Sequence, residues 1–229
     1  MHEELKADLS KAHHILHMEG LAEDTYRGHV TARTDDGHVY IKAWAVGFEE
    51  VNPGNLVCVD MEGKPVEKQG RLHSELPIHL EIYRRRPETR AVVHIHPYHA
   101  TMLSALWTGA LRVVTQNGMH FADGVPFYEA IELVNSRELG ERLVATMGDR
   151  FVVLMRNHGI VTAGRTLAEA IILAIDFEKA AREHLFSSLF GTPSEVPANV
   201  AEKMSNSIFT QQQYGLMWDF YCRKLARRG

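Results

Sequence analysis

The stretch AVVHIHP at residues 91–97 combines a predicted buried strand with two histidines. Its apolar residues favour a strand, and Pro97 ends it because proline has no amide hydrogen to donate to a sheet. His94 and His96 are two positions apart, so in a strand both side chains point to one face, roughly 6–7 Å apart. Two imidazoles at that separation can bind one metal ion. The alternative is that both are partly buried histidines bonded to the backbone.

A third metal ligand is expected elsewhere in the chain, because zinc rarely binds to only two protein ligands. His158 is the natural candidate, since it lies in the polar turn 156–158 between predicted strands at residues 151–155 and 159–163. A turn of this kind can direct a side chain towards a neighbouring element. His158 therefore completes a candidate three-histidine site.

Three further residues are candidates for proton transfer. Glu75 begins a predicted helix over residues 75–85, where a carboxylate in the first turn stabilises the helix. Beside a three-histidine metal site, the same carboxylate can instead be a fourth ligand or a general base. His120 and Tyr128 lie within the irregular stretch 111–128, and a structural role is the alternative for each.

Helix and strand patterns surround this stretch on both sides. Apolar residues at three- and four-residue spacing predict helices, and short apolar runs bounded by turn residues predict strands. The expected helices cover residues 4–20, 75–85 and 98–106, two segments capped by Ser136 and Thr166, and about 199–223; the further strands cover 29–33, 39–43 and 56–60. This order predicts a single α/β domain over residues 1–229, with a largely antiparallel or mixed sheet and a helical tail from about residue 199.

Composition narrows the function classes. The chain has 229 residues with 25 Lys and Arg against 29 Asp and Glu, a net charge of −4, which argues against a general nucleic-acid binder. Two cysteines, Cys58 and Cys222, are too few for a disulfide framework or a cysteine zinc site. No apolar run approaches the roughly 18 residues of a membrane span, and the charged start is unlike a secretory signal. We therefore expect a cytoplasmic protein without a membrane partner.

Four motifs occur in an order that resembles the class II aldolase/adducin family: GHVTAR at 28–33, Ser74-Glu75, AVVHIHP at 91–97 and Asn157-His158-Gly159. The resemblance runs from about residue 8 to about residue 190. It implies a three-layer α/β/α sandwich around a mostly antiparallel sheet, assembled as a homotetramer with the active site at a subunit interface. It also implies that His94, His96 and His158 bind the metal, and that Glu75 is a catalytic acid or base that can also bind it.

The sequence departs from the sugar-phosphate aldolases of that family, which hold phosphate with Gly-Asn, Thr-Gly and Ser-Ser pairs. Here these regions read Gly28-His29, IKAW at residues 41–44 and His73-Ser74. Imidazole and ammonium groups replace neutral donors, which favours a flatter substrate that carries carboxylates. Decarboxylases of hydroxylated aromatic or pyridine dicarboxylates, also in the family, resemble this variant more closely. Four residues are candidates for substrate binding: His29, Lys42, Arg71 and Ser74. Ordinary surface or helix contacts are the alternative for His29, Lys42 and Arg71.

These observations predict a metal-dependent carbon–carbon lyase acting on a small carboxylate. We expect it to decarboxylate a hydroxylated aromatic dicarboxylate of the phthalate or pyridine type, while one divalent ion stabilises the enolate. Three imidazoles suit Zn²⁺, and an added carboxylate would also suit Mn²⁺, Co²⁺ or Fe²⁺. One alternative is an aldolase or epimerase acting on a sugar phosphate or a hydroxy-keto acid. A second is a non-catalytic assembly module like adducin, although the adducin branch typically lacks the metal histidines.

Overall fold

A seven-stranded sheet forms the centre of the molecule. The structure is a computed structural model, which describes residues 2–67, 70–106 and 110–228. The strands are β1 (His29–Arg33), β2 (Val39–Lys42), β3 (Leu56–Val59), β4 (Ala91–Ile95), β5 (Phe127–Tyr128), β6 (Val152–Met155) and β7 (Gly159–Gly164). Their order is β3-β2-β1-β4-β7-β6-β5, and every neighbouring pair is antiparallel except the parallel β5–β6 pair. The prediction of a mostly antiparallel sheet is confirmed.

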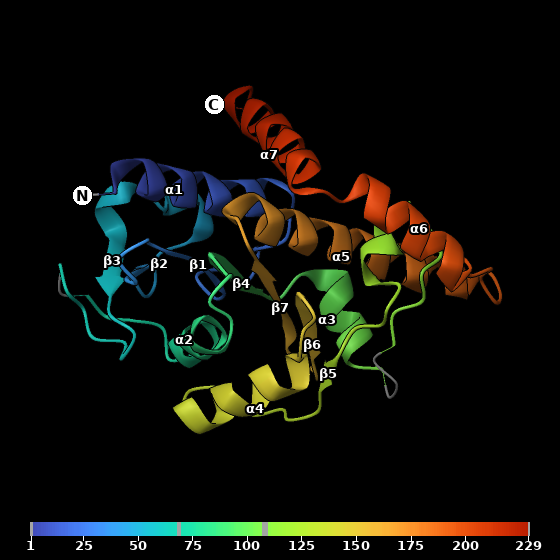
Figure 1. Cartoon of the computed structure of the whole chain (residues 1–229), viewed down its shortest axis with the longest axis horizontal. Helices are drawn as coiled ribbons and strands as arrows, with labels where there is room; N and C mark the ends of the chain where they lie inside the picture. Colours follow the sequence, from blue (N-terminus) through green and yellow to red (C-terminus); the bar gives the residue numbers. More distant parts are fainter. Residues whose placement is uncertain (1, 68–69, 107–109, 229) are drawn as a thin grey trace.

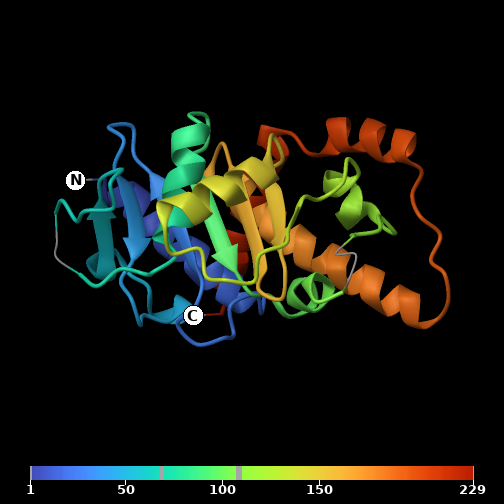
Figure 2. The ribbon, with the colours of Figure 1, turned by 90° about the horizontal axis from the view of Figure 1, so that it is seen from below.

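Helices cover both faces of this sheet, so the predicted α/β/α sandwich is also confirmed (Figure 1). One face packs against α1 (Glu3–Met18), α3 (Tyr98–Ser104), α5 (Leu167–Leu189) and α7 (Gln211–Ala226). The other face packs against α2 (Leu76–Arg85) and α4 (Arg137–Met147). Figure 2 shows α2 and α4 in front of the strands and α5 behind them. Three short 3₁₀ helices connect these elements: η1 (Phe48–Glu50), η2 (Pro53–Asn55) and η3 (Gln116–Phe121).

The central strand β4 alternates between the two cores. Val93 and Ile95 pack into the core that contains α1 and α5, whereas Val92 packs into the core under α2. Because successive side chains of a strand point to opposite faces, His94 shares the face of Val92. The alternation therefore directs His94 towards α2, the helix that Glu75 precedes.

The turn between β6 and β7 is tight, as its polar sequence predicts. Asn157 has a φ of 52°, in the left-handed region that asparagine tolerates better than most residues. The amide of His158 donates to the carbonyl of Met155 at 3.2 Å and closes the turn. His158 is thus carried at the end of a hairpin.

Two differences between the predicted and the observed elements affect the site and the C-terminal segment. β4 ends at Ile95, so His96 lies just beyond the strand instead of inside it. The C-terminal segment forms two helices, α6 (Ala198–Ile208) and α7, where one helix was expected. Thr210 starts the second, because its Oγ1 accepts a hydrogen bond from the amide of Gln213 at 3.3 Å. α7 packs against α1 and α5. Within the described ranges, no helix is both long and apolar enough to cross a membrane.

Candidate metal centre

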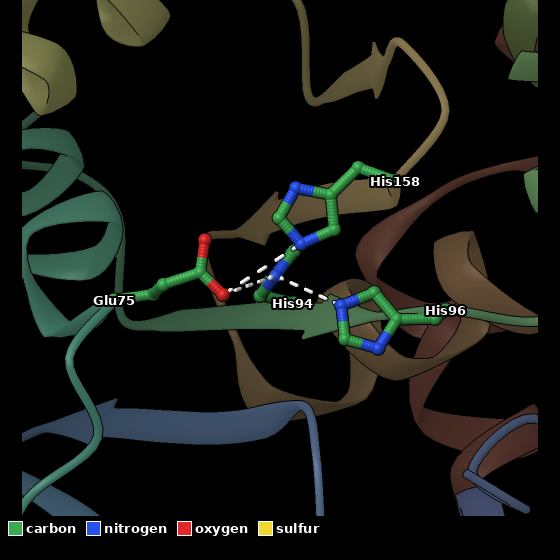
Figure 3. A group of neighbouring side chains, drawn as sticks. All are labelled: Glu75, His94, His96 and His158. Atoms are coloured by element: carbon green, nitrogen blue, oxygen red, sulfur yellow. Dashed lines mark hydrogen bonds and ion pairs between the residues drawn. The ribbon is translucent and has the colours of Figure 1, made fainter. Parts of the chain in front are cut away.

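Four side chains from distant parts of the chain meet at one point (Figure 3). One carboxylate oxygen of Glu75 and one ring nitrogen each of His94, His96 and His158 all lie within 4.8 Å of one another. Nε2 of His94 is 3.2 Å from Nε2 of His96 and 3.5 Å from Oε2 of Glu75. That oxygen is also 3.6 Å from Nε2 of His158. The structure brings together all four residues that were predicted to bind a metal.

Hydrogen bonds to two of the rings determine which nitrogens are free. Nδ1 of His94 donates to the carbonyl of Ile160 at 3.1 Å, and Nδ1 of His96 donates to Oδ2 of Asp24 at 2.6 Å. A neutral imidazole has one ring hydrogen, so both Nε2 atoms carry bare lone pairs. Two bare lone pairs facing each other repel unless a cation lies between them. Two such rings with outer hydrogen-bond partners, the third imidazole of His158 and one carboxylate form a donor set that fits a divalent metal ion.

The carboxylate of Glu75 is oriented from its other side. The amide of Val134 donates to Oε1 at 3.2 Å, which leaves Oε2 towards the histidines. Burial alone would raise the pKa of Glu75, but His94 and His158 together lower it below the ordinary value of a glutamate. Likewise, burial would raise the pKa of Asp24, and its hydrogen bond to His96 lowers it. Both groups are therefore anionic beside the candidate metal.

Gly159 allows the hairpin of His158 to approach the end of β4. A Cβ at this position would lie 2.4 Å from the carbonyl oxygen of Ile95 and 2.8 Å from Cδ2 of His96. Any side chain would push the two segments apart. The glycine that follows His158 is therefore part of what forms the centre.

A cavity of about 630 Å³ opens beside the four ligands. Glu75, His96 and His158 line it, while His94 is fully buried. The other lining residues come mainly from the loops before β1 and α2 and from the turn after β6: Asp24, Tyr26, Arg27, Gly28, His29, Trp44, His73, Ser74, Thr101, Leu133 and Asn157. Its volume lies in the range typical of small-molecule sites.

The residues predicted to bind substrate separate into two groups. His29 and Ser74 line the cavity. Lys42 does not, because strand alternation turns its side chain to the face opposite Ile41, and it is fully buried. Its ammonium donates to the carbonyls of Tyr26 at 2.7 Å and Val46 at 2.8 Å. Burial lowers the pKa of Lys42 to about 8. Lys42 therefore supports the loops around the cavity and does not face the substrate space.

Arg71 is also absent from the cavity wall. Its guanidinium lies over the indole of Trp44, 3.7 Å from the ring centroid. Trp44 itself lines the cavity, so Arg71 contacts the back of a wall residue. Its predicted contact with substrate is replaced here by a cation–π contact that holds the indole.

The two other candidates for proton transfer lie apart from the metal centre within this chain. His120 lines a second cavity of about 210 Å³, where its Nε2 bonds to Oδ2 of Asp176 at 3.0 Å. Tyr128 lies in β5, is buried in the core under α2 and α4, and lines neither of these cavities. Sequence order alone could not show this, because both residues lie in the irregular stretch before α4.

Several wall residues were not predicted from the sequence. Asp24 carries no motif, and only the fold brings it to His96, 72 positions away. Arg27 directly precedes the Gly28-His29 pair, which was a signal for its proximity to the site. His79 is not a wall residue but is fully buried behind the wall; it follows Glu75 by four residues, a spacing that places both on one side of α2.

Comparison with known proteins identifies the family of this chain. The model of the class II aldolase and adducin N-terminal domain matches residues 7–185. A 3,4-dihydroxyphthalate decarboxylase from Terrabacter sp. is 33% identical over 189 residues, which cover 76% of this chain and 78% of that protein. A 5-deoxy-D-ribulose 1-phosphate aldolase from Bacillus thuringiensis serovar kurstaki is 27% identical over 172 residues, which cover 75% and 79% of the two chains.

A solved structure, an aldolase II superfamily protein from Pseudomonas syringae, superimposes with a TM-score of 0.90 at 27% identity, covering 99% of this chain and 93% of that one. Fold, motif order and the matched domain model lead to one assignment. This chain belongs to the class II aldolase and adducin family.

Proposed function

We propose that this protein is a metal-dependent lyase that decarboxylates a hydroxylated aromatic dicarboxylate. The observation that carries the proposal is the convergence of Glu75 and three imidazoles beside a cavity in the size range of small-molecule sites. The relative named 3,4-dihydroxyphthalate decarboxylase supports this choice of substrate class. The anionic Glu75 and the three histidines would hold Zn²⁺, or Mn²⁺, Co²⁺ or Fe²⁺.

A divalent ion bound there would supply a Lewis acid, which stabilises the negative charge left on the substrate when carbon dioxide departs. The protein's own side chains position the aromatic substrate and exchange its proton. Trp44 presents a flat apolar wall to an aromatic ring, and Arg71 behind it holds the indole in place. Among the four candidate metal ligands, Glu75 is the one proposed to exchange a proton with the substrate as well.

Arg27 is the candidate anchor for the second carboxylate. Among the described residues that line the cavity, it is the only arginine or lysine. Its guanidinium forms no hydrogen bond or ion pair with the described part of the chain, so it is available to a ligand. A guanidinium binds a carboxylate through two parallel hydrogen bonds. Arg27 thus takes the role that was predicted for Lys42 and Arg71.

The proposal is tested with protein loaded separately with Zn²⁺, Mn²⁺ and Co²⁺. Each sample is incubated with 3,4-dihydroxyphthalate and with isomeric hydroxyphthalates, and released carbon dioxide is measured. We expect turnover with at least one metal and none after chelation. Absence of release with every metal and acid, in protein that binds the metal, would contradict the proposal.

A second candidate function is aldol cleavage of a sugar phosphate. It is favoured by the relative named 5-deoxy-D-ribulose 1-phosphate aldolase, and Arg27 can bind a phosphate as well as a carboxylate. Cleavage of phosphorylated ketoses by the metal-loaded protein, without carbon dioxide release from phthalates, would favour this function.

An assembly module without catalysis would bind no divalent ion. A homotetramer and a cytoplasmic location remain predictions of the family resemblance and of composition.

A further inference from the structure

A line of buried polar groups runs from the cavity into the core under α2. Nδ1 of His29 is 2.7 Å from Nε2 of His79, whose Nδ1 is 2.8 Å from Oγ1 of Thr31. Oγ1 of Thr31 is in turn 2.8 Å from the hydroxyl of Tyr83. All four side chains are almost completely buried. They form a hydrogen-bonded relay, and none of the four takes part in the proposed mechanism as described above.

Regular secondary structure makes this relay continuous. His29 and Thr31 are two residues apart in β1, so their side chains share one face of the strand. Because His29 pairs with His94, which points towards α2, this face is directed towards α2. His79 and Tyr83 are four apart on α2 and share one side of that helix. The relay therefore joins one strand to one helix directly behind the metal centre.

The contacts themselves determine how many hydrogens the relay contains. At 2.7 Å, the contact between Nδ1 of His29 and Nε2 of His79 needs one nitrogen that carries a hydrogen and one bare nitrogen. The contacts of Thr31 with His79 and with Tyr83 each need one donor and one acceptor in the same way. Burial raises the pKa of Tyr83, so the phenol keeps its hydrogen.

The inner end decides the direction of donation. Within residues 2–67, 70–106 and 110–228, the Thr31 hydroxyl is the one group positioned to accept the hydrogen of Tyr83. Thr31 then donates to Nδ1 of His79, and Nε2 of His79 donates to Nδ1 of His29. The opposite direction would bury the phenol hydrogen without an acceptor. In the favoured direction His29 carries its hydrogen on Nε2.

That nitrogen faces the substrate space. His29 lines the cavity, and its Nε2 has no hydrogen-bond partner in the described part of the chain. We infer that Tyr83, Thr31 and His79 are positioning residues that present His29 as a neutral hydrogen-bond donor to an anionic oxygen of the substrate. The substrate contact rests on the proposed function, whereas the position of the hydrogen does not.

The hydrogen on His29 is tested directly by nitrogen NMR of zinc-loaded protein labelled with ¹⁵N in its histidine rings. Protonated and bare ring nitrogens differ in chemical shift, and His29→Gln identifies the signals of His29. We expect the hydrogen on Nε2. Thr31→Val removes the donor to His79 and should move both His29 signals towards averaged values, while Thr31→Ser should restore them.

A hydrogen on Nδ1 of His29 in the wild type, or signals that are unchanged in Thr31→Val, would overturn the inference. If Thr31→Val does not fold, Tyr83→Phe removes only the first hydroxyl and should shift the same signals. In turnover assays we expect Thr31→Val to lower kcat/KM about tenfold at unchanged zinc content, with Thr31→Ser near wild type. Loss of zinc together with activity would instead indicate a purely structural role and contradict the inference.

The two proposals fail separately. A protein with the hydrogen on Nε2 of His29 that decarboxylates no hydroxyphthalate would refute the proposed function and leave the relay intact. A protein that decarboxylates hydroxyphthalates but carries the hydrogen on Nδ1 would refute the relay alone.

Discussion

Two histidine clusters in this molecule use similar side chains in different ways. At the metal centre, His96 bonds to Asp24 through Nδ1, and its bare Nε2 faces Nε2 of His94 at 3.2 Å. In the second cluster, His120 bonds to Asp176 through Nε2 at 3.0 Å and to the hydroxyl of Tyr214 through Nδ1 at 3.3 Å. Each cluster thus pairs a histidine with a carboxylate, but only the first leaves a nitrogen free.

The second cluster connects helices. Asp176 lies in α5 and Tyr214 in α7, while Lys179 bonds to Asp176 at 3.4 Å and to the hydroxyl of Tyr221 at 3.2 Å. Phe209, between α6 and α7, stacks on the ring of His120. With both ring nitrogens bonded, His120 has no lone pair for a metal. A histidine–carboxylate pair therefore indicates a metal ligand only where the second nitrogen is free.

The largest expected difference between the clusters is metal binding itself. His94→Ala removes a ligand from the centre, so we expect loss of the bound divalent ion and a fall in decarboxylation of at least about a thousandfold. His120→Ala is the matched control and should keep its metal. Metal content is measured by elemental analysis of the folded protein, and activity by carbon dioxide release. Full metal content in His94→Ala would contradict this assignment.

Removing a cation near each cluster should have different effects on KM for a hydroxyphthalate. Arg27→Gln removes the proposed carboxylate anchor and is expected to raise KM for a hydroxyphthalate by about 10–100-fold, because hydrogen bonds to charged groups are strong. Lys179→Gln, in the second cluster, should leave KM unchanged. The monocarboxylate o-hydroxybenzoate lacks the second carboxylate. Its inhibition constant should therefore be nearly equal in the wild type, Arg27→Gln and Lys179→Gln. If Arg27→Gln weakened the binding of o-hydroxybenzoate as much as that of the hydroxyphthalate, Arg27 would not be the residue that binds the second carboxylate.

The two carboxylates provide a sharper comparison. Asp24→Asn weakens the hydrogen bond that orients His96, so we expect metal affinity to fall by about 10–100-fold with little change in stability. Asp176→Asn should leave metal affinity unchanged and lower the free energy of unfolding by about 1–3 kcal/mol. Calorimetric metal titration and urea denaturation measure the two quantities. Equal effects of both substitutions on metal affinity would remove the distinction between the clusters.

The smallest expected effect is on acid stability of the metal-free protein. Burial lowers the pKa of His13 and of His73 to about 3, so the unfolded chain binds protons that the folded chain does not. Stability is therefore fully present above about pH 6.5 and falls as the pH drops towards 3. Between pH 7.5 and 5 each such histidine should cost about 2 kcal/mol of unfolding free energy.

Urea denaturation at these two pH values checks this dependence. His13→Gln should reduce the loss by about 2 kcal/mol, whereas substitution of the exposed His17 by Gln should not change it. A pH dependence that His13→Gln leaves intact would show that this buried histidine is not responsible.

Local pattern was enough for much of the fold and of the metal centre. Strand alternation predicted that His94 and His96 meet on one side, and they do so although His96 lies just beyond β4. The polar turn predicted that His158 lies between two strands. Lys42 was misassigned because its charge was considered without its face of β2. Nothing in the sequence around His120 shows that Asp176 and Tyr214 occupy both of its nitrogens, and its catalytic role stays a prediction.

Most strands and helices, and the side of a strand on which a histidine lies, follow from the sequence alone, because they depend on residues within a few positions of one another. Tertiary structure alone decided the partners of each ring nitrogen. Asp24 reaches His96 across 72 positions, and His29 reaches His79 across 50. A lone pair is free or bonded according to what lies within about 3 Å of it, and such neighbours are set by packing between elements.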